Sequence, residues 1–514
     1  MFESAELGHK IKKSVYEKEM PPLRVALLEA QDELRQRAEF PVIIIVGGLD
    51  GSGRGATVNL LNEWMDPRHI ETHGMGDPSD EELDRPMMWR FWRSLPPKGK
   101  IGVFFGSWYT WPVLNRVSGI TKDADLDQSL ARARRLEKML VDEGALLIKL
   151  WLHLSKEQQE KRLKALEKNP ATHWKVTERD WKRYKAYDSF RAVHETLIRQ
   201  TSTAEAPWMV VEGEDDNYRN LTVGNIILKS IRSRLEHNQA QSAKVVAPPL
   251  MPPLDCLHLL KTLDMGQTLD KTDFRKKLEK YQTKLGLLMR HPKFKYMSVI
   301  AVFEGNDAAG KGGAIRRITR AIDARSYQVI PIAAPTEEER AQPYLWRFWR
   351  HLPRKGRMCI FDRSWYGRVL VERVEGYCSP ADWMRAYSEI NDFEAQMARH
   401  NLLVVKYWLA ISQEEQLRRF EEREKTCFKR FKITEEDWRN REKWEDYVQA
   451  VCDMVDRTST SAAPWILVEA NNKYFARIKV LKTLCAQIEQ KLKDLEASGI
   501  DYLDKPQKKR ALSL

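Results

Sequence analysis

The chain has 514 residues, of which 42% are hydrophobic and 31% are charged, a composition that excludes disordered and fibrous classes. Single cores rarely grow beyond about 250–300 residues, so we expect two domains of similar size. The 86 basic and 73 acidic residues give a net charge of +13, which favours a polyanionic partner: nucleic acid, an acidic membrane surface, nucleotides or polymeric phosphate.

The start of the chain and its apolar runs argue against export and membrane insertion. Glu3 and Glu6 stand where a signal peptide carries basic residues, and no apolar segment follows them. Apolar runs such as residues 41–46 are too short to span a bilayer. The six cysteines lack the close pairing of metal or redox sites. We therefore expect a cytoplasmic protein with reduced thiols and no membrane partner.

The first half of the chain alternates helical and strand patterns. A charged helical pattern over residues 24–37 precedes a β-branched run, 42–46, that meets a glycine-rich turn. Further strands are predicted over residues 101–105, 146–152 and 208–211. Residues 236–253 are polar and then rich in proline, which suits a semi-rigid connection between domains. We place the domain boundary near Ser242, dividing the chain into residues 1–242 and 243–514.

The second half repeats the same order of elements. A helical pattern over residues 271–290 precedes a strand at 299–303 and a glycine-rich loop, and a helical stretch follows at 314–321. Strands are then predicted over residues 358–361, 402–409 and 465–468. Strands that alternate with helices predict an α/β fold with a mostly parallel sheet flanked by helices, and such sheets bind ligands at the carboxyl ends of their strands.

A fixed offset of 257 residues relates the two halves. Residues 89–96 read WRFWRSLP and residues 346–353 read WRFWRHLP, with seven of eight positions identical. The same offset pairs Lys149 with Lys406 and Trp208 with Trp465. The repeated tryptophans, such as Trp92 and Trp349, are expected to pack in a core or interface, the alternative being stacking on a nucleobase.

Residues 305–313, GNDAAGKGG, have the spacing G-x-x-x-x-G-K between a strand and a helix. Such glycines let backbone N–H groups face phosphate oxygens, and the helix N-terminus and the lysine add positive charge. The alternative is a glycine-rich turn with a solvated Lys311. Gly312 stands where a Ser or Thr would hold Mg²⁺, so we expect Asp307 to replace it as a metal ligand.

Asp362 follows the strand predicted at residues 358–361, and Arg363 and Arg368 come after it. A carboxylate at that strand end could reach a phosphate-bound metal, and the arginines could neutralise phosphoryl charge in a transition state. The alternative for Asp362 is a helix cap. Residues 421–432 form a basic stretch between helical patterns that suits a lid with Arg423, Lys429 and Lys432, or else a solvated charge run.

Four segments together resemble the type-2 polyphosphate kinase family: GNDAAGKGG, WRFWRHLP, FDRSWYGRVLVERV and FKRFKIT. The resemblance covers nearly the whole chain, twice. It implies a thymidylate-kinase-like fold with a helical lid in each of two tandem P-loop kinase domains. It also implies dependence on Mg²⁺, with Mn²⁺ as an alternative, and phosphoryl transfer between inorganic polyphosphate and a nucleotide.

Family roles map onto single residues of the second half. The resemblance implies catalytic roles for Asp307, Lys311, Asp362, Arg363 and Arg423, with Asp307 and Asp362 as metal ligands. The expected substrate and phosphate contacts are Gly305, Ala308, Ala309, Gly310, Gly312, Gly313, Arg368, Glu372, Lys429 and Lys432. A basic groove for the polymer is expected from Arg316, Arg317, Arg354, Lys355 and Arg357.

The 257 offset shows what the first copy lacks. Lys311 corresponds to Arg54, Asp362 to Phe105, Arg363 to Gly106 and Arg423 to Leu166, whereas Asp307 keeps its counterpart Asp50. We therefore expect residues 1–242 to be non-catalytic and to pack on the second domain in place of a partner subunit, with further homo-oligomers left open.

The function expected from these features is transfer of the terminal phosphoryl group of polyphosphate to AMP, giving ADP, as in two-domain members of the family. Phosphorylation of ADP or GDP and the reverse synthesis of polyphosphate are alternatives within the same fold. A basic nucleic-acid-binding protein is a further alternative, but no recognition motif supports it, so no nucleic-acid partner is expected.

Overall fold

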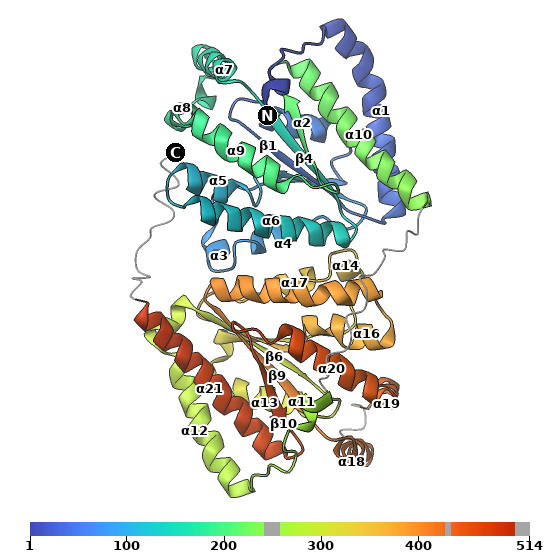
Figure 1. The fold of residues 1–514 in the computed structure, drawn as a ribbon, viewed down its shortest axis with the longest axis vertical. Coiled ribbons are helices and arrows are strands. Elements are labelled where there is room, and N and C mark those ends of the chain that lie inside the picture. The colour runs from blue at the N-terminus through green and yellow to red at the C-terminus, as the bar shows by residue number, and fades with distance from the viewer. Residues whose placement is uncertain (241–256, 427–432, 499–514) are drawn as a thin grey trace.

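The computed structural model describes residues 1–240, 257–426 and 433–498. Two α/β domains lie one above the other in Figure 1, and each is built on a five-stranded sheet. In the first domain the strand order is β2-β3-β1-β4-β5, with bounds β1 Val42–Gly48, β2 Ile70–Gly74, β3 Ile101–Phe105, β4 Leu146–His153 and β5 Trp208–Glu212.

The second sheet repeats the first, in the order β7-β8-β6-β9-β10. Its strands are β6 Ser298–Gly305, β7 Tyr327–Pro331, β8 Met358–Asp362, β9 Leu402–Ala410 and β10 Trp465–Glu469. All pairings in both sheets are parallel, and the central strands β1 and β6 are apolar and buried along nearly their whole length. Burial on both faces is what a parallel sheet covered by helices requires.

Helices cover both faces of each sheet (Figure 1). The first-domain helices are α1 Lys13–Arg37, α2 Arg54–Trp64, α3 Asp80–Leu83, α4 Trp89–Arg93, α5 Thr110–Val117, α6 Asp123–Asp142, α7 Lys156–Lys168, α8 Glu178–Lys185, α9 Tyr187–Thr201 and α10 Asp216–Ala240. Those of the second are α11 Leu257–Lys261, α12 Lys271–Met289, α13 Lys311–Thr319, α14 Glu337–Arg340, α15 Trp346–Trp349, α16 Val371–Glu375, α17 Pro380–Arg399, α18 Gln413–Glu424, α19 Glu435–Glu442, α20 Trp444–Thr458 and α21 Lys473–Ala497.

Local sequence sets where several helices begin. At α17, Ser379 accepts a hydrogen bond from the N–H of Asp382, whose side chain accepts from Ser379 N–H in return, and Pro380 occupies the first turn. This capping box satisfies backbone donors that the helix cannot. Within the part of the chain that the structure describes, no helix is both long and apolar enough to cross a membrane.

The predicted α/β class with two tandem repeats is confirmed, and some element bounds need correction. Edge strands β2 and β7 were not predicted, because their polar, partly exposed sequences lack an apolar run. Helix α1 begins at Lys13, before Pro21 and Pro22, residues that disfavour a helix interior. Residues 236–240, predicted as linker, complete α10, and the boundary proposed at Ser242 lies outside the described residues.

The two domains contact each other through equivalent surfaces. Helices α6 and α17 run side by side at the interface in Figure 1, and Arg135 Nε donates to Asp392 Oδ1 at 3.0 Å, two positions separated by the repeat offset. Trp92 and Trp349 stack with ring centroids 5.6 Å apart. The predicted packing role of these tryptophans is confirmed, and a single buried cluster runs through them from one domain to the other.

The interface also contains reciprocal hydrogen bonds. Arg85 Nε donates to the carbonyl of Leu352 at 2.8 Å, and Gln342 Nε2 donates to the carbonyl of Leu95 at 3.0 Å, each residue standing at the repeat counterpart of the other. Reciprocal contacts of this kind are the signature of a two-fold interface. The halves of the chain are therefore arranged like the subunits of a symmetric dimer.

Candidate functional site

A cavity of about 900 Å³ lies at the carboxyl ends of β6, β7 and β8. The second domain supplies most of its walls, from the loop after β6, the segment after β8 and helices α19 and α20. The first domain closes it with Lys98, Asp142, Glu143 and Gly144. This is the strand edge at which α/β sheets bind ligands, so the cavity is the leading candidate site.

The loop between β6 and α13 forms one end of the cavity. Gly305 and Gly310 have φ of 148° and 106°, and a Cβ at Gly305 would fall 2.5 Å from the carbonyl oxygen of Leu409. Ala308 has φ of 63°, and Ala309 is buried beneath the turn. Helix α13 begins at Lys311, so Gly312 and Gly313 lie in its first turn, and the Gly313 N–H donates back to the carbonyl of Gly310 at 2.9 Å.

Two buried contacts support this loop. Lys311 Nζ donates to the carbonyl of Gly305 at 2.6 Å, which holds its ammonium over the loop. Arg419, 2% exposed, donates from Nη1 to the carbonyls of Ala308 and Ala309 at 2.9 and 3.1 Å. The loop therefore has the shape and charge of a phosphate-binding loop, as the sequence predicted.

Carboxylates stand beside the loop. Asp307 Oδ1 accepts from Arg363 Nη2 at 3.3 Å, and Asp307 Oδ2 accepts from Asn440 Nδ2 at 2.8 Å. Asp362 is the last residue of β8, at the strand end where it was expected, and it pairs in register with Phe303 of β6. Asp307 lines the cavity, whereas Asp362 does not.

Glu304 is a site residue that the sequence analysis missed. It is 6% exposed, lines the cavity, and accepts from Ser364 Oγ at 2.8 Å. Burial raises the pKa of Glu304, while Lys311 and Arg363 oppose that rise. Its repeat counterpart is Gly47, so comparing the two halves at the 257 offset would have shown a carboxylate present only in the second domain.

Arg363 holds an unusual backbone conformation. Its φ of 64° lies in the left-handed region, which costs a non-glycine residue about 1–2 kcal/mol. The counterpart Gly106 has φ of 88°, so the same turn exists in the first domain without the side chain. Backbone strain of this kind is typical of functional sites, where it aims a side chain.

Another wall of the cavity combines aromatic and charged groups. The Arg368 guanidinium lies 4.0 Å from the centre of the Tyr344 ring, and Arg368 Nε is 2.8 Å from Glu372 Oε2. Burial raises the pKa of Glu372, and the Arg368 charge opposes this rise. Tyr344, Phe348 and Leu370 add apolar surface to the same wall. Both Arg368 and Glu372 therefore lie at the cavity, and their contact with substrate stays a prediction.

The predicted lid is only partly described. Residues 421–424 complete α18, which corrects the expectation that they lie between helices. Arg423 is in the last turn of that helix and is not among the described residues that line the cavity. Lys429 and Lys432 lie outside the described residues. In the expected basic groove, Arg354 is instead an interface residue, since its Nε donates to Asp84 Oδ2 at 2.7 Å.

The equivalent site in the first domain is smaller and filled by its own arginines. Its cavity is about 120 Å³, and Asp50 pairs with Arg54 and, at 3.2 Å, with Arg183. Burial acts to raise the pKa of Asp50, but these cations outweigh it and lower that pKa. A Cβ at Gly53 would fall 2.1 Å from the Arg219 guanidinium, and the repeat counterpart of Arg219 is Ala476.

The carboxylates beside the loop are the candidate metal ligands. Within the described ranges, no cluster of three or more His, Cys, Asp or Glu side chains is arranged to hold a metal ion. Mg²⁺ usually binds one or two carboxylates together with waters and substrate phosphates, so Asp307 and Asp362 beside a phosphate loop fit this ion without a preformed cage.

Comparisons with known proteins agree with this geometry. The family model described as polyphosphate kinase 2 matches residues 10–239 and again residues 268–496. The polyphosphate:AMP phosphotransferase of Pseudomonas aeruginosa is 59% identical over 95% of this chain and 99% of its own length. That of Acinetobacter johnsonii is 37% identical over 90% and 94%.

A solved structure supports the same assignment. The crystal structure of a protein from Pseudomonas aeruginosa PA01, assigned provisionally to polyphosphate kinase 2, superposes with a TM-score of 0.86. It is 56% identical and covers 96% of this chain and all of its own. With the family model matched twice, the chain belongs to the polyphosphate kinase 2 family.

Proposed function

We propose that this protein transfers the terminal phosphoryl group of inorganic polyphosphate to AMP, giving ADP. An oxygen of the AMP phosphate attacks the terminal phosphorus, the bridging P–O bond breaks, and the polymer leaves one phosphate shorter. The observation that carries the proposal is the cavity, which joins a phosphate-binding loop to a wall suited to a nucleoside. The long relatives named polyphosphate:AMP phosphotransferase support the choice of donor and acceptor.

The phosphate-binding loop and the aromatic wall of the cavity suit different substrates. Polyphosphate has no apolar surface, and the loop with Lys311 and Arg363 supplies the cations that it needs. The Tyr344 and Phe348 side offers aromatic surface that suits a nucleoside better than a chain of phosphates. We therefore assign the loop to the donor and the aromatic wall to AMP.

The chain's own residues position the reacting groups. Backbone N–H groups at the start of α13 and the Lys311 ammonium hold the donor phosphates, and the Arg363 guanidinium neutralises charge on the transferred group. Asp307 and Asp362 are the groups that would hold Mg²⁺, or Mn²⁺ in its place. When bound, the divalent ion neutralises phosphate charge, and the family is generally dependent on such ions. Arg423, in the last turn of α18, is proposed to help neutralise charge on the same transferred group.

The first domain, residues 1–242, is proposed to be non-catalytic. Its counterpart loop is occupied by Arg219, Asp50 is held by two arginines, and Phe105 and Gly106 replace the strand-end Asp-Arg pair. Losing one charge-stabilising donor typically costs about 10² to 10³ in rate, so three losses leave little chemistry. A cytoplasmic location remains part of this proposal.

The decisive assay supplies long-chain polyphosphate and Mg²⁺ with AMP, ADP or GDP in separate reactions and follows the nucleotides by chromatography. ADP formed from AMP, at a rate that falls at least a hundredfold in Lys311→Ala, is the expected result. Faster phosphorylation of ADP or GDP than of AMP would make that nucleoside diphosphate the acceptor. No phosphorylated nucleotide from any acceptor would overturn the proposal.

A further inference from the structure

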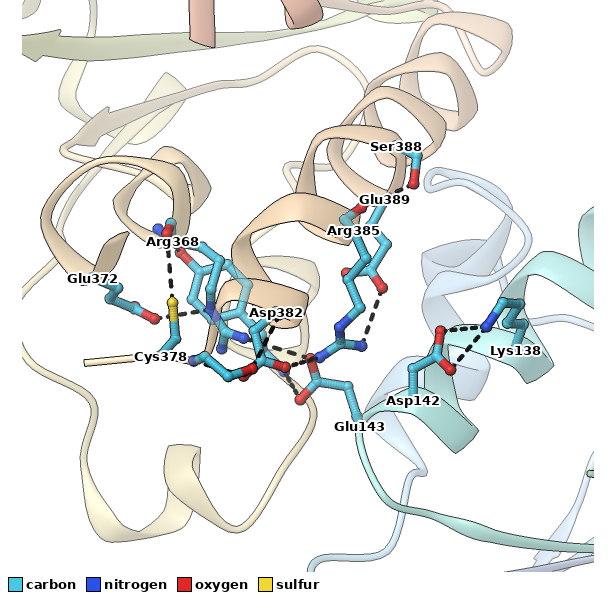
Figure 2. Close-up of polar contacts among 12 residues, drawn as sticks. Lys138, Asp142, Glu143, Arg368, Glu372, Cys378, Asp382, Arg385, Ser388 and Glu389 are labelled. Atoms are coloured by element: carbon cyan, nitrogen blue, oxygen red, sulfur yellow. Dashed lines mark hydrogen bonds and ion pairs between the residues drawn. The ribbon is translucent and has the colours of Figure 1, made fainter. Parts of the chain in front are cut away.

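Glu143, from the domain proposed to be non-catalytic, enters the cavity of the other domain. It follows α6, and Figure 2 shows its carboxylate among charged side chains of the segment after β8 and of α17. Glu143 Oε1 accepts from Arg385 Nη2 at 2.7 Å and lies 3.8 Å from Arg368 Nη1. Glu143 Oε2 accepts from the backbone N–H of Tyr344 at 3.4 Å. One carboxylate therefore joins three residues of the nucleotide wall.

The two arginines are held on their other sides by residues of their own domain. Arg385 also pairs with Asp382 at 2.8 Å and with Glu389 at 3.2 Å. The side chains of Glu143, Arg368 and Arg385 are only 15%, 14% and 17% exposed, so their interactions are weakly screened by solvent. Arg368 in turn pairs with Glu372 at 2.8 Å. Without Glu143, Arg385 is left with Asp382 and Glu389, and Arg368 with Glu372, all residues of their own domain.

The repeat provides an internal comparison for this contact. The counterpart of Glu143 is His400, and the counterparts of Arg368 and Arg385 are Trp111 and Gln128. The carboxylate of Glu143 therefore faces the site of the second domain, where both arginines are present, and the equivalent position facing the first domain has neither the carboxylate nor the arginines. By contrast, the hydrogen bonds that Arg85 and Gln342 make across the interface are repeat counterparts of each other, so that contact occurs twice. The pair of Arg354 and Asp84 also occurs once, but neither residue lines the cavity, whereas Glu143 and the arginines that it contacts do.

We infer that Glu143 is a positioning residue for the acceptor: it holds Arg368 and Arg385 in the orientation that binds the nucleotide. This inference rests on the proposed function, since the wall it organises is the one assigned to AMP. The first domain then contributes to the reaction by completing the acceptor site of the second. Both arginines line the cavity together with Tyr344.

The test compares Glu143→Gln with Asp392→Asn, which removes a different interdomain ion pair, that of Arg135 and Asp392 at 3.0 Å. A hydrogen bond to a charged group is worth about a tenfold to hundredfold change in affinity. We expect the KM for AMP, and the AMP dissociation constant measured by calorimetry, to rise by about that factor in Glu143→Gln. The KM for polyphosphate and the melting midpoint should match those of Asp392→Asn, whose KM for AMP stays at the wild-type value.

A second pair of variants separates positioning from direct contact. If Glu143 acts through Arg385, Glu143→Gln should add little to the loss already caused by Arg385→Gln. Glu143→Asp keeps the charge and should recover part of the AMP affinity. If Glu143→Gln unfolds at a lower temperature than the control, the AMP affinity of Glu143→Asp tests the positioning role instead. Independent losses in the double variant would contradict the positioning role.

The inference is overturned if Glu143→Gln binds AMP as Asp392→Asn does, or if only the KM for polyphosphate changes. Failure of the proposed function is visible separately, in the wild-type reactions. Should the wild type prefer another nucleotide, the same comparison is made with that acceptor.

Discussion

Replacing Arg363 by glycine is expected to separate catalysis from stability. The left-handed backbone of Arg363, at φ of 64°, costs about 1–2 kcal/mol with a side chain present. Glycine removes that cost but loses about 0.5–1 kcal/mol of chain entropy on folding. The ion pair with Asp307 spans 3.3 Å, and because Arg363 is 44% exposed it contributes only about 0–1 kcal/mol. The Arg363→Gly protein should thus stay within about 1 kcal/mol of the wild type.

The rate should change far more. Loss of a group that stabilises transition-state charge typically costs about 10² to 10³ in kcat, which is about 3–4 kcal/mol. Arg363→Ala is the matched control, because it loses the same charge but keeps a Cβ in the left-handed turn. It should be as inactive as Arg363→Gly and melt about 2–4 °C lower, the shift expected for about 1 kcal/mol in domains of this size.

Polyphosphate-dependent ADP formation and thermal unfolding measure the two effects. An Arg363→Gly protein that kept more than about a tenth of wild-type kcat would refute the charge argument. Equal melting midpoints for the two variants would refute the backbone argument, since they differ only by the Cβ at that turn.

Three further predictions concern both domains. Asp362→Asn should lower kcat at least a hundredfold and Asp50→Asn less than twofold, and the reverse pattern would place catalysis in the first domain. Burial raises the pKa of Glu389 to about 7, above its value of about 4.5 in an unfolded chain. The free energy of unfolding should therefore fall by up to about 3 kcal/mol as the pH rises from about 4.5 to 7, and then level off. Melting midpoints between pH 5 and 8 should show this fall, and Glu389→Gln should flatten it. Lys406 and Glu394 form a 2.7 Å pair at 0% and 1% exposure, so Lys406→Met should cost about 3–5 kcal/mol in urea unfolding, and a cost below about 1 kcal/mol would contradict the pairing.

The sequence alone determined the repeat, the fold class and the phosphate loop, because each has a local pattern. The apolar runs of β1 and β6, the glycines around Lys311 and the fixed offset can be recognised without knowing any long-range contact. The offset also identified what the first copy lacks, including the residues opposite Asp362 and Arg363. Edge strands β2 and β7 escaped prediction because only their hydrogen bonds to β3 and β8 define them.

Tertiary structure alone decided how distant residues combine. Glu304 becomes a site residue because β6 ends beside Ser364, and Arg219 fills the first loop because α10 crosses Gly53. Glu143 looks like an ordinary residue after a helix, and its meaning depends on the contact with Arg385, 242 positions later. Packing of two domains brings such pairs together, and packing follows from the summed burial of many side chains, which no local pattern records.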